Sequence, residues 1–401
     1  MSLSSTHEET LSPNEALKLK KNSWVMSSMD KKILSTLLAL ITIIAGFSLA
    51  TDVFFTPRNF SNLLVQGSIN GILAVGMTYV ILLAGVDLSV GSVAGLIGIV
   101  VGISQAHWGW AESGIPGFIT TLVFALAAGI LIGVFNGALI SILKIHSFVI
   151  TFGMMVIARG LATIFSGAST ISPVGPELNF LGTGTLTGIW VEIVLFVPAL
   201  AWITFILLDE KKGRAQKSVT PSSRVFFKIF SVVVGTAALY FVSSYKGLPI
   251  PVLLCALVAF AGAWILARTR FGRYVFAVGG NAEAARLAGI NVKRITFLVF
   301  VAMSSLAALA SVVLTGRLNS AGPNAGTLFE LDAIAAVVIG GTSLKGGKGS
   351  VLGSVLGALI ITSLKNGMDL LEIQSYYQNI MLGGIVILAV SIDSLVERKM
   401  D

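Results

Sequence analysis

The chain has 401 residues, of which 55% are hydrophobic and only 11% are charged, and its mean hydropathy is +0.90. A soluble domain usually carries about 25% charged residues, so a soluble fold of this size could not bury so much apolar surface, and lipid must solvate much of the chain. The formal net charge of +8 does not indicate a nucleic-acid partner, because the basic residues stand in short clusters between apolar runs, as membrane topology signals do.

Apolar runs of helical length divide the chain into twelve predicted helices. In chain order they cover 33–50, 63–84, 88–106, 118–140, 148–167, 189–208, 225–244, 249–267, 295–315, 328–343, 349–364 and 376–392. A spanning helix needs about 20 residues. The pattern therefore predicts an all-α, polytopic transmembrane bundle of about twelve spans over 33–393, in which 33–50 is an uncleaved first span. The polar tails 1–32 and 394–401 then lie on the same side of the membrane.

The distribution of basic residues predicts which side that is. Of the 27 Lys and Arg, 22 fall in the two tails and the alternate loops around Lys144, 209–228, 268–294 and 345–348. Four fall in the opposite loops, and Arg159 falls within a span. Basic residues concentrate in cytoplasmic segments, so we expect both termini to be cytoplasmic.

Many of the 43 glycines are spaced by four residues, as at Gly129, Gly133 and Gly137. Small residues at this spacing let helix backbones approach closely in lipid. The spacing favours tight packing within one bundle and leaves a subunit-dimer face as the alternative. Two stretches, 85–95 and 341–353, also share a GSVxG-like pattern, which leaves open whether they descend from an internal repeat.

The loop 268–294 is long and basic, and it contains a short predicted helix over 281–289. Asn281 is a good N-cap, Glu283 suits the first turn, and Gly289 is a typical C-terminal residue. A capped helix between two spans is suited to docking into a partner's groove, although a surface helix without a partner has the same features.

Several motifs in this loop and along the chain are those of a known family. EAARLAG at 283–289 fits the EAA-three-residues-G element that permease subunits of ABC importers present to their ATPase subunits. The Leu-Pro that follows in the classical family is absent, which favours another branch. The whole chain resembles ribose/xylose-type sugar permeases. The shared motifs are NLL at 62–64, GILAVGMTYVIL at 71–82, GVDLSVGS at 85–92, NGALI at 136–140, FVITFGM at 148–154, GRYVFAVGGNAEAARLAGINV at 272–292, ELDAIAAVVIGGTSLKGGKGSVLG at 330–353 and NGM at 366–368.

The resemblance implies the architecture of a type II ABC importer permease, with a ten-helix core. Residues 185–247 would be an inserted two-helix hairpin, which with KGLPIPVLL at 246–254 favours the xylose branch over ribose, galactose or similar sugars. The implied partners are a cytoplasmic ATP-binding subunit, a periplasmic sugar-binding protein, a second copy of the chain and the lipid of the inner membrane. The implied ATPase-coupling residues are Asn281, Glu283, Ala284, Ala285, Arg286 and Gly289.

Polar residues within the apolar runs are candidates for the translocation path or its gating. Asp87 is interpreted as the one carboxylate deep between apolar runs, and intramembrane charge often marks function. Capping of the helix at 88–106 is the favoured role, because the amides of a first helical turn lack partners. Asn70, Asn136 and Arg159 are weaker candidates, each favoured as an interhelical hydrogen-bonder over a sugar ligand.

Catalytic, metal and cofactor sites are not expected. GGKGS at 346–350 lacks the first glycine of a phosphate loop, where Thr342 stands, and the Ser or Thr after the lysine, where Gly349 stands. The three histidines are dispersed, which supports neither a metal site nor a catalytic dyad. The main alternative function is an ion-coupled secondary transporter, which would need several buried acids near the membrane midplane.

Overall fold

A computed structural model of the chain describes residues 28–215 and 222–398. Most of the predicted tail 1–32, residues 216–221 of the predicted loop 209–228, and the last three residues lie outside the described residues. The chain divides into two compact units: residues 192–239 with the chain before Lys32, and residues 32–191 with 240–401. The larger unit carries all the segments that are candidates for function.

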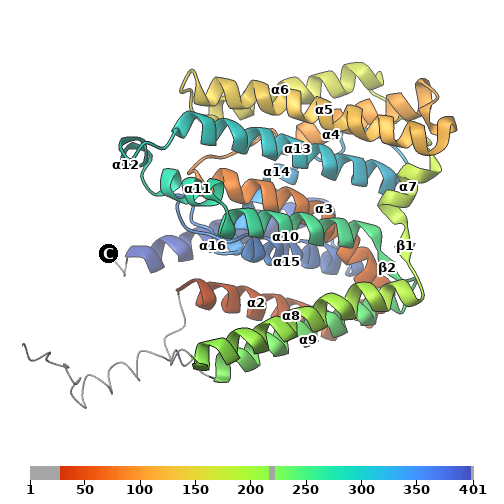
Figure 1. Cartoon of the computed structure of the whole chain (residues 1–401). Helices are drawn as coiled ribbons and strands as arrows, with labels where there is room; N and C mark the ends of the chain where they lie inside the picture. The colour runs from red at the N-terminus through yellow and green to blue at the C-terminus, as the bar shows by residue number, and fades with distance from the viewer. Residues whose placement is uncertain (1–27, 216–221, 399–401) are drawn as a thin grey trace, which may run out of the picture. The chain divides into compact units, whose positions relative to one another are not determined.

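The described chain is almost entirely helical (Figure 1). The first half of the larger unit contains α2 (Ser28–Ala50), α3 (Pro57–Leu82), α4 (Val90–Gly102), the π-helical turn η1 (Ile103–His107), the 3-10 turn η2 (Trp110–Ser113), α5 (Gly114–Ser141), α6 (Ser147–Ser166) and α7 (Pro176–Thr183). The second half contains α10 (Ile250–Arg268), α11 (Arg270–Gly280), α12 (Ala282–Leu287), α13 (Val292–Leu318), α14 (Phe329–Ile339), α15 (Val351–Leu370) and α16 (Ser375–Arg398).

The predicted inserted hairpin corresponds to α8 (Ile189–Ala215) and α9 (Ser222–Ser243). Before and after it in the chain, the two-residue strands β1 (Thr185–Leu186) and β2 (Leu248–Pro249) of the larger unit pair antiparallel.

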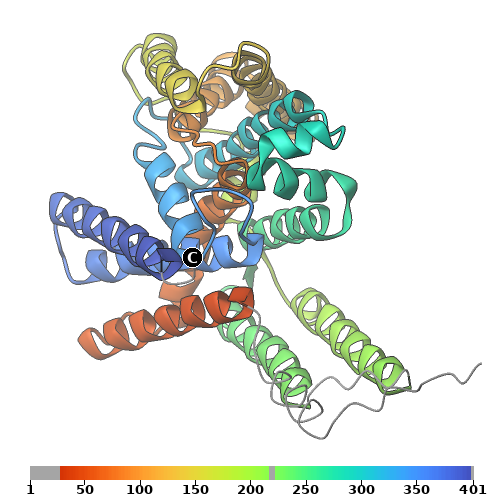
Figure 2. The ribbon, with the colours of Figure 1, turned by 90° about the vertical axis from the view of Figure 1, so that its left-hand side faces the viewer.

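Helix α3 forms the centre of the larger unit. It packs against α10, α13, α14 and α15, and in the end-on view it lies among them (Figure 2). Ile72, Leu73, Met77 and Ile81 are fully buried, as are residues on every other side of the helix. Protein therefore covers every side of this helix, including its polar residues Asn70 and Thr78.

The all-α class is confirmed, and each of the twelve predicted segments coincides with a helix. Nine helices within 28–215 and 222–398 are long and apolar enough to cross a membrane. The prediction of a full span at 328–343 is wrong, because α14 has 11 residues, which cover about 16 Å of a hydrocarbon core about 30 Å thick. The short helix α7 was not predicted at all.

The glycine row of α5 packs within the chain, as favoured from the sequence. A Cβ atom on Gly129 would lie 2.8 Å from the Ser304 carbonyl oxygen of α13, and one on Gly133 would lie 2.7 Å from Val301 Cα. The two helices therefore meet backbone to backbone, and this row is not free to form a dimer face.

Candidate functional site

The predicted coupling helix forms between α10 and α13 as α12 (Ala282–Leu287), directly after α11. The Asn281 side chain accepts a hydrogen bond from the Ala284 amide (2.9 Å), so Asn281 is the N-cap that the sequence predicts. The chain leaves the helix through Gly289, whose φ of +83° is costly for residues with a side chain. Local chemistry therefore fixes both ends of this helix.

Two charged side chains lie on the exposed surface of α12. Arg286 donates two hydrogen bonds to Glu283, at 3.0 and 2.6 Å, and this hydrogen bonding holds the pKa of the Glu283 carboxyl below its ordinary value. The pair is solvent-exposed, so it contributes little to stability. It leaves an ordered, charged surface beside the helix.

The predicted coupling residues differ in exposure. Ala285 is only 4% exposed and packs in the protein's own hydrophobic core. Ala284 is exposed, and Leu287 is 74% exposed. A leucine so exposed on a charged helix is a candidate anchor, and its place three residues after Ala284 could have revealed it.

A backbone joint connects this region to two turns of the membrane bundle. Gly279, near the end of α11, packs so closely on the Leu82 carbonyl at the end of α3 that a Cβ atom would collide with it. The same Cβ would lie 2.8 Å from the Gly347 nitrogen, and the Gly347 amide donates a hydrogen bond to the Leu82 carbonyl (2.9 Å). The turn just before the segment 85–95 thus lies against Gly346 and Gly347, in the middle of the segment 341–353.

The prediction that Asp87 caps the next helix is wrong. Helix α4 begins at Val90, its N-cap position is Ser89, and no side chain caps it. Asp87 Oδ1 instead accepts hydrogen bonds from the Ser89 amide (2.9 Å) and the Ser89 hydroxyl (2.6 Å), two residues on. Its Oδ2 atom is buried and has no hydrogen-bond partner.

Asp87 is also not the one buried carboxylate. Glu330 and Asp332, in the first turn of α14, are 9% and 7% exposed, so the interpretation of Asp87 as the one carboxylate between apolar runs is wrong. Asp332 pairs with the Lys365 ammonium of α15, and Glu330 Oε2 has no hydrogen-bond partner. The larger unit therefore has a charged interior next to α14.

Irregular backbone runs beside this interior, between α13 and α14. Lipid offers no hydrogen bonds, so non-helical backbone at membrane depth needs partners from the protein. Arg159 of α6 donates to the carbonyls of Pro323 (2.6 Å) and Ala325 (3.0 Å), and the stretch pairs with another loop at Ala321. Arg159 thus makes structural hydrogen bonds, although they join a helix to a loop and not two helices.

The two predicted asparagines also make contacts between helices. Asn70 of α3 donates to Thr362 Oγ1 of α15 (3.3 Å), and Asn136 of α5 donates to Ser89 Oγ (3.4 Å). Asp87 and Asn136 therefore share Ser89 as a partner, whereas Asn70 lies with other residues.

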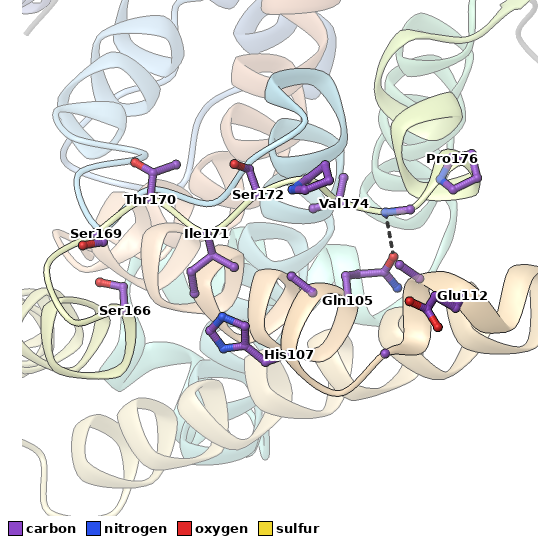
Figure 3. Close-up of a pocket in the computed structure, with 15 residues that line it drawn as sticks. Gln105, His107, Glu112, Ser166, Ser169, Thr170, Ile171, Ser172, Val174 and Pro176 are labelled. Atoms are coloured by element: carbon purple, nitrogen blue, oxygen red, sulfur yellow. Dashed lines mark hydrogen bonds between the residues drawn. The ribbon is translucent and has the colours of Figure 1, made fainter.

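Two cavities lie at the end of the larger unit away from α12. The larger, about 760 Å³, is bounded by η1, the start of η2 and the loop after α6 (Figure 3). Gln105, in the wall of this cavity, accepts a hydrogen bond from the Gly175 amide (3.0 Å) and donates one to Thr121 Oγ1 (2.7 Å). The smaller, about 160 Å³, is lined by Asn70 and by the Asp332–Lys365 pair.

Comparison with known proteins gives a family and close relatives. Residues 59–390 match the family described as branched-chain amino acid transport system / permease component. The xylose transport system permease protein XylH of Haemophilus influenzae is 40% identical over 382 residues, covering 94% of this chain and 99% of the relative. XylH of Escherichia coli K12 is 37% identical, covering 93% of this chain and 94% of the relative. The ribose import permease protein RbsC of the same organism is 36% identical, covering 91% of this chain and 94% of the relative.

No solved structure matches the chain. The resemblance to ribose/xylose-type permeases is confirmed by these relatives, which align along nearly the whole length. The chain belongs to the permease family of the branched-chain amino acid transport system type.

Proposed function

We propose that this chain is the membrane-spanning permease subunit of an ATP-driven importer of monosaccharides, with D-xylose as its substrate. The observation that carries the proposal is the alignment of 94% of the chain with a xylose transport permease at 40% identity. Ribose permeases align almost as far at slightly lower identity, so another pentose or galactose is the alternative substrate. The hairpin α8–α9 supports the xylose branch.

The energy source in this proposal is a separate ATP-binding subunit that docks on α12. Glu283, Ala284 and Leu287 are exposed on one short helix whose two ends are fixed by Asn281 and Gly289. A rigid, capped element gives a partner a defined surface and loses little conformational entropy on docking. Hydrolysis itself takes place in that partner.

The backbone joint between Gly279, Leu82 and Gly347, here called the glycine joint, would carry motion from α12 into the membrane. Gly279 lies two residues before the N-cap of α12 and touches the backbone at the end of α3 and in the turn before α15. Contacts between backbones leave no flexible side chain to absorb a displacement. A shift of α12 would therefore move both turns, and with them α3, α14 and α15.

The distribution of basic residues supports one orientation of the permease in the membrane. The end with α12 and both termini would face the cytoplasm, and the end with the two cavities would face the periplasm. A sugar-binding protein would deliver its ligand at that outer end, and a second copy of the chain would complete the path in the inner membrane.

Ion-coupled transport is the second candidate, because buried acids are present. Asp332 is neutralised by Lys365, and Arg159 of α6 holds the irregular backbone between α13 and α14. These contacts give Asp332 and Arg159 structural roles, and the relatives named as components of transport systems favour an ATP-driven importer.

The substrate is tested by uptake into vesicles that contain the permease, its ATP-binding subunit and its binding protein. We expect D-xylose to be taken up faster than D-ribose, D-galactose or leucine at equal concentration. Faster uptake of ribose or galactose would overturn the assignment of xylose alone, and uptake of leucine without any sugar would overturn the monosaccharide class.

A further inference from the structure

The smaller cavity is built by five helices in the half of the larger unit away from α12. Arg317 lies in the last turn of α13, about 37 Å along that helix from its first residue beside α12. The wall also includes Gln66 and Asn70 of α3, Phe329 and Asp332 of α14, Lys365 and Asp369 of α15 and Gln378 of α16. A cavity of about 160 Å³ has the volume of about five water molecules, so its occupant is a small molecule.

Three polar side chains of the wall have groups without a hydrogen-bond partner in the described part of the chain. Asn70 is only 8% exposed; its amide nitrogen donates to Thr362, while its Oδ1 atom accepts no hydrogen bond. Gln66 and Arg317 make no hydrogen bond or ion pair with the described residues. Gln66 and Arg317 are half-buried and line the cavity with Asn70, so these groups offer a ligand both acceptors and donors.

The remaining wall residues are already committed to one another. Lys365 pairs with Asp332, and Gln378 donates to Asp369 Oδ1 (2.7 Å) and to the Ile373 carbonyl (2.8 Å). These bonds fix the positions of the charged groups. The wall carries two cationic and two anionic side chains in all, so its formal charge is balanced and does not select an ion.

The ring of Phe329 adds an apolar surface to this polar wall. Planar amides, a guanidinium group and one aromatic face are the groups that suit a small ring with hydroxyls around its edge and C–H bonds on its faces. A fixed set of few polar groups in a partly apolar cavity is typical of a small-molecule site.

We propose that this cavity is a sugar-binding subsite in the outer part of the translocation path, in which Gln66, Asn70 and Arg317 bind the hydroxyls of a single neutral pentose. This inference rests on the proposed function as a sugar permease. It assigns to the permease itself a step of sugar recognition after release from the binding protein.

The test compares two substitutions in the wall with a matched substitution outside it. Gln66→Met and Arg317→Met remove hydrogen-bonding groups and keep side-chain length. Asn62→Leu is the control, because Asn62 lies one turn earlier on the same helix, is exposed and does not line the cavity. Thermal unfolding of each purified variant shows whether it is folded before binding is measured.

Binding of radiolabelled D-xylose is measured on the full-length permease in lipid nanodiscs without its partners. We expect saturable binding that Gln66→Met and Arg317→Met each weaken about tenfold, as for the loss of one good hydrogen bond, and that Asn62→Leu leaves unchanged. In the complete importer we expect the wall variants to lower the maximal uptake rate, with half-saturation unchanged because the binding protein captures the sugar.

The outcomes separate this inference from the proposed function. If the complete wild-type importer takes up xylose but the permease alone binds none, or if folded wall variants bind like wild type, the subsite is refuted and the function stands. Displacement of xylose by leucine at equal concentration refutes the sugar selectivity of the cavity. Absence of uptake for every monosaccharide by the complete wild-type importer refutes both.

Discussion

Asp87 is held in an extended turn by hydroxyl groups from a different helix. The Val86 amide donates to Ser147 Oγ (3.2 Å) and the Leu88 amide to Thr151 Oγ1 (3.1 Å), both on α6. These bonds satisfy amides that a helix would otherwise use, so α4 starts only at Val90. The Asp87 carboxylate then closes a small turn with Ser89, in a position from which water is excluded.

Substitution of Asp87 separates its hydrogen bonds from its charge. Asn keeps an oxygen that can accept from Ser89, so we expect Asp87→Asn to fold and transport as wild type. Asp87→Ala leaves the Ser89 amide without this partner and should lower the free energy of unfolding by about 1 kcal/mol or more. Thermal unfolding in lipid and uptake by the complete importer measure the two effects.

The informative contradiction would come from the Asn variant. If Asp87→Asn inserts and unfolds like wild type but loses uptake, the charge of Asp87 is required for transport. Asp87 Oδ2 and Glu330 Oε2, which have no hydrogen-bond partner, would then be the next groups to substitute.

At the scale of the element, the two neighbouring alanines of α12 give opposite predictions. Ala284 is exposed, so Ala284→Trp should leave the permease stable but prevent the ATP-binding subunit from co-purifying. Ala285 is buried, so Ala285→Trp should destabilise the permease by about 1–3 kcal/mol through overpacking. Co-purification of the ATP-binding subunit and thermal unfolding of the permease alone distinguish them; normal association in Ala284→Trp would remove α12 from the interface.

The glycine joint allows a test with adjacent residues of one helix. Both Gly279 and Gly280 lie in α11, where alanine suits the backbone better than glycine. A Cβ atom collides with Leu82 at Gly279 but has no heavy atom within 4 Å at Gly280. We expect Gly279→Ala to lower ATP-driven uptake about tenfold, the size of a typical coupling between sites, and Gly280→Ala to leave it unchanged.

The measurement for this pair is uptake beside association of the ATP-binding subunit. Gly279→Ala should still bind that subunit, because the exposed face of α12 is unchanged. Equal uptake by the two variants would show that the joint does not transmit motion.

Elements with local signals were predictable, and elements set by distant contacts were not. Asn281 and Gly289 act within a few residues of themselves, so the sequence predicts α12 with both its ends. The apolar run 328–343 reads as a span, but Leu328 has a φ of +68° and the backbone before it is held by Arg159 of α6. That contact crosses more than 160 residues, and only the fold reveals it.

For the whole molecule, the topology is open to direct labelling. In a Cys255→Ala background, single cysteines placed within 211–217 should be accessible only from the cytoplasm, and those within 245–248 only from the periplasm. Periplasmic labelling of 211–217 would invert the proposed sides, and the outer end with its cavities would then face the cytoplasm.

The class and family were within reach of the sequence because they rest on composition and on ordered motifs along the chain. The charged interior could not be predicted from the sequence, although Glu330 and Asp332 are ordinary acidic residues of the run 328–343. An apolar run around them hides the fact that they are buried, and the partner of Asp332 lies 33 residues away at Lys365. The smaller cavity likewise draws on residues from five helices.

The most direct test of the account is the energy source of sugar uptake. In vesicles with the permease, its ATP-binding subunit and its binding protein, we predict xylose uptake that requires ATP on the α12 side and continues when ionophores collapse all ion gradients. Uptake by the permease alone, driven by an ion gradient and abolished by the ionophores, would contradict it.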